Sequence, residues 1–149
     1  MKESSQFIVF LEMSITPVAL ISGVGLLLLT ITNRLARTID RSRKLIVLLN
    51  DAVGEPKERY TLELVLMYKR SRLLRNSIAS IVASMFLNAL IIPLLFFMSL
   101  YGLDLRMEGY ILFFTAIVAI LISLSFFMGD VLLTLRGLKM DVNHLLPKK

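Results

Sequence analysis

The residues best suited to bind an ion lie near the start of a long apolar stretch, residues 7–32. On insertion scales, a charged side chain costs about 2.5–3.5 kcal/mol at the centre of a membrane span and less near its end. We therefore expect the carboxylate of Glu12 to have a function. Hydroxyl residues and a proline, which leaves one helix carbonyl without its usual donor, follow closely. Oxygen atoms are the ligands that calcium prefers. We therefore predict an ion filter, with a calcium ion held at Glu12. Its residues are Glu12, Ser14, Thr16 and Pro17.

Small and polar residues continue from Glu12 along one face of the expected helix. Steps of three or four residues reach Thr16, Ala19, Gly23, Leu26, Thr30, Asn33 and Arg37. Such a face either lines water or lets another helix pack closely, and the sequence leaves both interpretations open. In the first, Leu26 or Leu27 forms a hydrophobic constriction. The predicted pore-lining and gate residues are Ala19, Gly23, Leu26, Leu27, Thr30 and Asn33.

Charged residues after the first apolar stretch, together with one in the third, form a predicted cytoplasmic charge network. It consists of Arg34, Arg37, Asp40, Arg41 and Asp130. Charges inside membranes pair with one another, so we expect Asp130 to meet Arg34 or Arg75 at the same depth. Asp40 has the spacing of helical ion pairs with its basic neighbours. Asn88, in the middle of the second apolar stretch, is expected to hydrogen-bond another helix.

The composition excludes several kinds of site. Of 149 residues, 56% are hydrophobic, against about 45–50% in typical soluble domains. There is no cysteine and a single histidine, His144, so disulfides and Cys- or His-cluster metal sites are excluded. The chain carries none of the common nucleotide-binding, zinc-protease or hydrolase motifs. We expect no enzyme activity and no cofactor other than a bound calcium ion.

The apolar stretches predict an all-α membrane protein with three transmembrane helices, at residues 7–32, 77–101 and 110–135. Residues 33–76 continue the helical pattern on both sides of a break at residues 50–56, which contain Asn, Asp, Gly and Pro. They predict an antiparallel helical hairpin, and residues 136–149 a short tail. Residues 1–149 are expected to be a single membrane domain that assembles into a symmetric homo-oligomer.

The distribution of charge predicts the orientation of the chain. Residues 33–75 hold eleven Lys and Arg against five Asp and Glu, so this segment accounts for the whole net charge of +6. An excess of Lys and Arg marks the cytoplasmic side. We therefore expect the hairpin and the C-terminus in the cytoplasm and the N-terminus outside. The basic residues are expected to contact anionic lipid headgroups, and no nucleic acid is expected as a partner.

Two segments carry a resemblance to a known family. Residues 14–29, followed by Asn33, Arg34 and further basic residues, and the basic run at residues 69–75 resemble the domain of unknown function 2721. This resemblance covers nearly the whole chain and implies a small multi-pass protein of the bacterial cytoplasmic membrane, without implying an activity. The order of one span, a cytoplasmic hairpin and two further spans is also similar to the layout of the Oxa1-type insertase superfamily.

These features predict a homo-oligomeric cation channel, permeable to calcium, because one three-span chain cannot easily enclose a pore. The first helix of each copy would line the pore, with a ring of Glu12 carboxylates at its outer end. Two alternatives stay open: an Oxa1-like insertase or chaperone module, and a structural or regulatory membrane subunit without transport. A channel needs Glu12 to face a symmetry axis, whereas an insertase needs a hydrophilic groove within one protomer.

Overall fold

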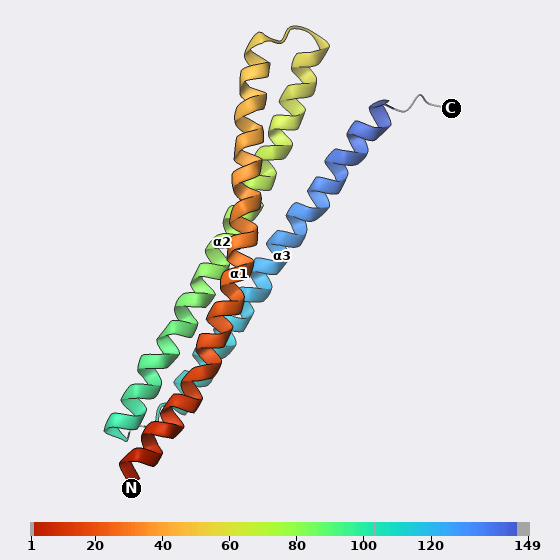
Figure 1. Ribbon diagram of the computed structural model, residues 1–149. Coiled ribbons are helices and arrows are strands. Elements are labelled where there is room, and N and C mark those ends of the chain that lie inside the picture. The colour runs from red at the N-terminus through yellow and green to blue at the C-terminus, as the bar shows by residue number, and fades with distance from the viewer. Residues whose placement is uncertain (1, 103, 146–149) are drawn as a thin grey trace. The chain divides into compact units, whose positions relative to one another are not determined.

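The computed structural model describes residues 2–102 and 104–145. The regular structure of this described part is entirely helical: α1 (Lys2–Asp51), α2 (Glu55–Tyr101) and α3 (Arg106–Leu145) (Figure 1). Each of these three helices contains a stretch that is long and apolar enough to cross a membrane. The prediction of an all-α protein with three spanning helices is therefore confirmed, and the chain is a multi-pass membrane protein.

The helices extend beyond the predicted spans. α1 continues from the first apolar stretch through the first arm of the predicted hairpin, and α2 joins the second arm to the second apolar stretch. No glycine or proline interrupts residues 26–53, so nothing in the sequence ends α1 at the edge of its apolar stretch. α3 likewise continues past residue 135 into the predicted tail, whose residues 146–149 lie outside the described part.

A short turn joins α1 to α2. Gly54 has a φ of 76°, a left-handed conformation that favours glycine, and its carbonyl accepts a 3.0 Å hydrogen bond from the backbone N–H of Lys57. Pro56 follows in the first turn of α2, where a backbone donor is not needed. Glu55 and Glu58 lie in the same turn, and negative charge is favourable at the N-terminus of a helix.

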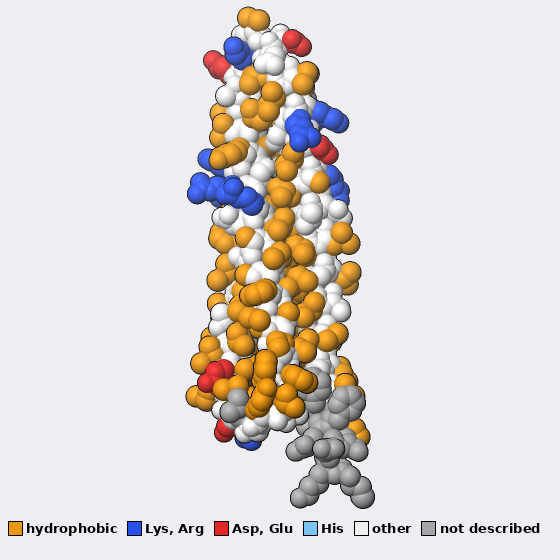
Figure 2. All heavy atoms as spheres, turned by 90° about the vertical axis from the view of Figure 1, so that its left-hand side faces the viewer, with side chains coloured by type: hydrophobic (Ala, Val, Ile, Leu, Met, Phe, Trp, Pro, Cys, Tyr) orange, Lys and Arg blue, Asp and Glu red, His pale blue; other side chains and the backbone are white. Residues whose placement is uncertain are grey.

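The chain divides into two compact units, and unit 1 comprises Met1–Leu29 and Ala79–Ser123. Its buried hydrophobic residues are Val24, Ile81, Ile91 and Ala116. Its buried polar residues are Ser84, Asn88 and Ser123. Many of its large hydrophobic side chains are exposed, including those of Ile15, Phe86 and Phe114. On the face drawn in Figure 2, this unit presents mainly hydrophobic side chains, as a surface in contact with lipid would.

Asn88 does not make the interhelical hydrogen bond expected from the sequence. Its side chain is buried, and Nδ2 donates to the backbone carbonyl of Ser84 at 3.0 Å and to Ser84 Oγ at 3.5 Å, both within α2. Residues four apart share one helix face, which puts this carbonyl within reach. Among the described residues, no hydrogen-bond partner lies near Asn88 Oδ1.

Unit 2 comprises Thr30–Ile78 and Leu124–Lys149. Its parts of α1 and α2 lie antiparallel as a hairpin, and the C-terminal part of α3 diverges from this hairpin (Figure 1). Its core contains Ile31, Leu45 and Leu74 together with the buried polar residues Thr38, Ser77 and Asp130. α2 and α3 approach closely at Gly129, where an added Cβ would lie 3.3 Å from Leu73 Cδ1. In Figure 2, Lys and Arg side chains gather over this unit.

Candidate functional site

An open groove of about 1320 Å³ lies in unit 2, and residues of all three helices line it. Its charged lining residues are five arginines and three glutamates: Arg34, Arg37, Arg41, Arg59, Arg70, Glu55, Glu58 and Glu63. Hydroxyl and amide groups come from Thr30, Asn33, Thr38 and Thr134. The apolar part of the groove lining includes the side chains of Leu62, Leu66, Leu133 and Leu138. The groove is therefore amphipathic, with a net positive charge, and it is formed within a single chain.

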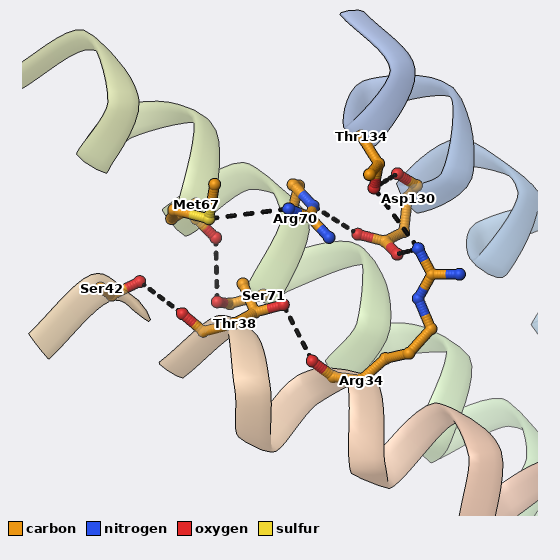
Figure 3. A network of polar contacts seen from close by, with 8 residues as sticks. All are labelled: Arg34, Thr38, Ser42, Met67, Arg70, Ser71, Asp130 and Thr134. Carbon is orange, nitrogen blue, oxygen red and sulfur yellow. Dashed lines mark hydrogen bonds and ion pairs between the residues drawn. The ribbon is translucent and has the colours of Figure 1, made fainter. Parts of the chain in front are cut away.

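Beside this lining, a buried carboxylate joins the three helices (Figure 3). The side chain of Asp130, on α3, is 0% exposed. Arg70, on α2, donates from Nε to Asp130 Oδ1 at 2.9 Å. Arg34, on α1, places Nη2 at 3.0 Å from Asp130 Oδ2, as an ion pair that lacks the geometry of a hydrogen bond. We call these three residues the ion triad.

Further contacts hold both guanidinium groups of the ion triad in place. Arg34 Nη2 donates to Thr134 Oγ1 at 3.4 Å, and the guanidinium carbon lies 5.2 Å from the centre of the Phe127 ring, within the range of a cation–π contact. Arg70 Nη1 contacts Met67 Sδ at 3.7 Å. Planar guanidinium groups with several fixed partners lose little additional freedom when they bind a ligand.

The ion triad carries more positive than negative charge, because two guanidinium groups share one carboxylate. The side chains of Arg34 and Arg70 are 30% and 15% exposed and line the groove. The carboxylate of Asp130 is hidden from solvent. A molecule that enters the groove at this point therefore meets positive charge and hydrogen-bond donors, which favour carboxylate and phosphate groups.

Two of the three acidic lining residues lie toward the other end of the groove, near the turn between α1 and α2, and Glu63 lies between the two ends. Glu55 and Glu58 belong to the first turn of α2. Glu63 accepts hydrogen bonds from Arg41 at 2.7 and 3.0 Å. Along α2, Glu58 and Arg70 are separated by about 18 Å at about 1.5 Å per residue. The groove thus has a mixed-charge end near the turn and a basic end beside the ion triad.

The residues of the predicted ion filter lie in unit 1 and do not line the groove. Glu12 and Thr16 are exposed, Ser14 is half-buried and Pro17 is buried. In the part of the chain that the structure describes, no cluster of three or more His, Cys, Asp or Glu side chains could hold a metal ion. Glu12 therefore contributes a single carboxylate per chain, and a calcium site there would need several copies.

The predicted pore-lining residues divide into two sets. Ala19, Gly23, Leu26 and Leu27 belong to unit 1, and all four are exposed. Thr30 and Asn33 belong to unit 2 and line the groove. The second set therefore faces a space that one chain forms with its own α2 and α3.

The structure brings together one pair of the predicted charge network, Arg34 and Asp130. Arg37 and Arg41 line the groove, while Asp40 is exposed and Arg41 pairs with Glu63. Sequence reasoning missed Arg70, the second partner of Asp130. Arg70 belongs to the basic run at residues 69–75, so the sequence marked the segment without indicating which of its residues meets α3.

The fold and the groove define a class: a small, all-helical, three-span membrane protein with a groove of net positive charge lined by all three helices. Residues 14–140 match DUF2721, described as a protein of unknown function. This match covers most of the chain, which therefore belongs to the DUF2721 family. No curated protein and no solved structure matches the chain.

Proposed function

We propose that this protein is an insertase-like membrane chaperone that holds a short polar segment of another membrane protein while that protein enters the bilayer. The observation that carries this proposal is the groove, in which arginine, hydroxyl and amide groups lie beside leucine side chains within one chain. A segment that enters a membrane has both polar and apolar parts. A groove with both kinds of lining supports the passage of such a segment.

Hydrogen bonding in the groove would lower the cost of this passage. Moving an unpaired polar group from water into apolar surroundings costs about 2–7 kcal/mol, depending on the reference state. The exposed side chains of Asn33 and Arg37 line the groove and supply donors that replace part of the lost water contacts. Acidic residues of the client would be attracted to the basic end of the groove. The proposal needs no catalytic step and no cofactor.

The proposal places the groove on the cytoplasmic side of a bacterial inner membrane. The Lys and Arg excess of residues 33–75 supports this orientation, with the N-terminus outside and the C-terminus inside. A reporter fused after Lys149 should therefore be active only in the cytoplasm. A periplasmic signal from the same fusion would overturn the orientation and, with it, the access of clients to the groove.

Narrowing the groove tests the proposal directly. Gly137 lines the groove and an added Cβ there meets nothing within 4 Å, so the position has room for a side chain and Gly137→Leu adds an apolar one to the groove lining. Gly23→Leu in unit 1 is a matched control, because an added Cβ there also meets nothing within 4 Å. With liposomes and a single-span client, measured by protease protection, we expect Gly137→Leu to reduce insertion and Gly23→Leu to preserve it. Equal insertion with both variants would contradict the proposal.

A calcium-permeable homo-oligomeric channel is the second candidate, and the exposed polar face of α1 in unit 1 favours it. Glu12 and Thr16 are exposed, so copies of the chain could bring them together around an axis. Calcium flux into liposomes should then be lost in Glu12→Gln without loss of assembly. Flux that is equal in the variant would rule out Glu12 as the filter. A protein with neither insertion nor flux activity would be a structural or regulatory subunit.

A further inference from the structure

We infer that the basic end of the groove binds the phosphate group of an anionic phospholipid, between Arg37 and the two arginines of the ion triad. The site would be a specific one in the groove, distinct from general attraction of the hairpin to a charged membrane surface. It shares the groove with the proposed function but does not rest on it, since a lipid can occupy the groove whether or not a client does.

The charge of the accessible groups selects an anion. In the described part of the chain, Arg34 and Arg70 share a single carboxylate, and that carboxylate is fully buried. Arg37 is exposed, lines the groove and has no carboxylate within 4.0 Å among the described residues. The exposed side-chain amide of Asn33 lies in the same lining and supplies a further hydrogen-bond donor. A phosphate has the oxygen atoms to accept from several of these donors at once.

The position of these residues along α1 favours a lipid as the source of the phosphate. The first apolar stretch ends at residue 32, so Arg34 and Arg37 lie about 3 and about 8 Å beyond it along the helix. The headgroup layer on each side of a bilayer is about 5–8 Å thick. Both arginines therefore lie at the depth of lipid phosphates, and Leu133 of the groove wall, which belongs to the third apolar stretch, can contact an acyl chain.

The ion triad prepares the site for its ligand. Arg34 is fixed by contacts with Asp130, Thr134 and Phe127, and Arg70 by its hydrogen bond to Asp130. The phosphate therefore meets guanidinium groups that are already ordered, and binding orders only Arg37. Preorganised groups bind more tightly than flexible ones, because less side-chain freedom is lost.

Arg37→Gln tests the site, because this exposed residue can lose its charge without disturbing the ion triad. Arg75→Gln is the control for diffuse attraction: Arg75 is exposed, lies close to the start of the second apolar stretch and does not line the groove. The full-length chain is reconstituted with phosphatidylglycerol and phosphatidylethanolamine, and retained lipids are counted by native mass spectrometry. We expect wild type to retain phosphatidylglycerol preferentially. Arg37→Gln should weaken this lipid retention about fivefold, the effect of one basic residue at an anionic surface. Arg75→Gln should hold phosphatidylglycerol as well as wild type does.

Four results would overturn the inference. Equal losses in Arg37→Gln and Arg75→Gln would mean diffuse surface attraction, and equal retention of both lipids would mean that the phosphate charge is not recognised. Displacement of the lipid by inorganic phosphate at millimolar concentration would assign the site to a soluble anion. Gly137→Leu gives an independent check, since it adds an apolar side chain to the groove lining without changing any charge. It should lower lipid retention, and wild-type retention in this variant would place the lipid elsewhere. None of these measurements involves a client, so failure here and failure of the insertion assay can be told apart.

Discussion

Replacing Asp130 with asparagine should destabilise the protein more than any other single loss of a carboxylate in unit 2. Among the described residues, Asp130 supplies the only carboxylate that pairs with Arg34 and Arg70, and its side chain is 0% exposed. Asparagine is similar to aspartate in size, so packing changes little. The substitution would instead leave two guanidinium groups together without a counter-charge, in surroundings where water reaches them only in part.

The size of the effect follows from the burial of the two arginines. Removing one partner of a buried ion pair costs about 3–5 kcal/mol. We expect the lower end of this range, about 3 kcal/mol, because Arg34 is 30% exposed and can turn toward the groove. For a chain of 149 residues, this corresponds to a fall in Tm of about 6–12 °C.

Thermal unfolding in detergent micelles, followed by circular dichroism, measures this fall. Asp40→Asn is the matched control, because Asp40 is an exposed carboxylate in the same unit, and its Tm should change by no more than about 2 °C. Arg70→Met should cost less stability in the Asp130→Asn background than in wild type, since its partner is already gone. Equal melting of the two Asp→Asn variants, or strict additivity with Arg70→Met, would refute the role assigned to the ion triad.

The same melting assay checks three smaller effects. Gly129→Leu should lower the free energy of unfolding by about 1–3 kcal/mol through overpacking, because even a Cβ there would lie 3.3 Å from Leu73. Gly137→Leu should be neutral or stabilising. Asn88→Leu should leave the free energy of unfolding unchanged or raise it by up to about 1 kcal/mol, because it removes the buried Oδ1 that has no described partner. A clear loss of stability would mean that Asn88 Oδ1 has a partner. Arg41→Gln should lower the free energy of unfolding by less than about 1 kcal/mol, because the Arg41 side chain in the pair with Glu63 is 59% exposed. High salt should reduce the difference in stability between this variant and wild type.

The helices were predictable from the sequence, but their ends were not all predictable. Long apolar stretches in a membrane form helices, since no water is present there to hydrogen-bond the backbone N–H and C=O groups. Gly54 and Pro56 mark the turn between α1 and α2. The edge of an apolar stretch, however, marks where the bilayer ends and not where a helix ends. Residues 26–53 contain no helix breaker, so α1 passes this edge unchanged.

The candidate site was predictable only in part, because it depends on how the helices are rotated against each other. The sequence identified Asp130 as a charge that needs a partner and Arg34 as one candidate. It could not select Arg70 from the basic run at residues 69–75, since each step along a helix turns a side chain by about 100°. That rotation depends on how α2 and α3 pack, as in their close approach at Gly129 and Leu73, and a pattern of charges does not contain this information.

The two candidate functions place opposite demands on α1, and one pair of variants separates them. A channel uses Glu12 at its outer end and Asn33 at its inner exit, so Glu12→Gln and Asn33→Leu should both reduce calcium flux. An insertase uses only the groove, which Asn33 lines and Glu12 does not. Asn33→Leu should then reduce client insertion while Glu12→Gln leaves it unchanged. Because both residues are exposed, neither substitution should impair folding. Loss of insertion in Glu12→Gln alone would contradict the groove as the site of action, since that residue lies in unit 1.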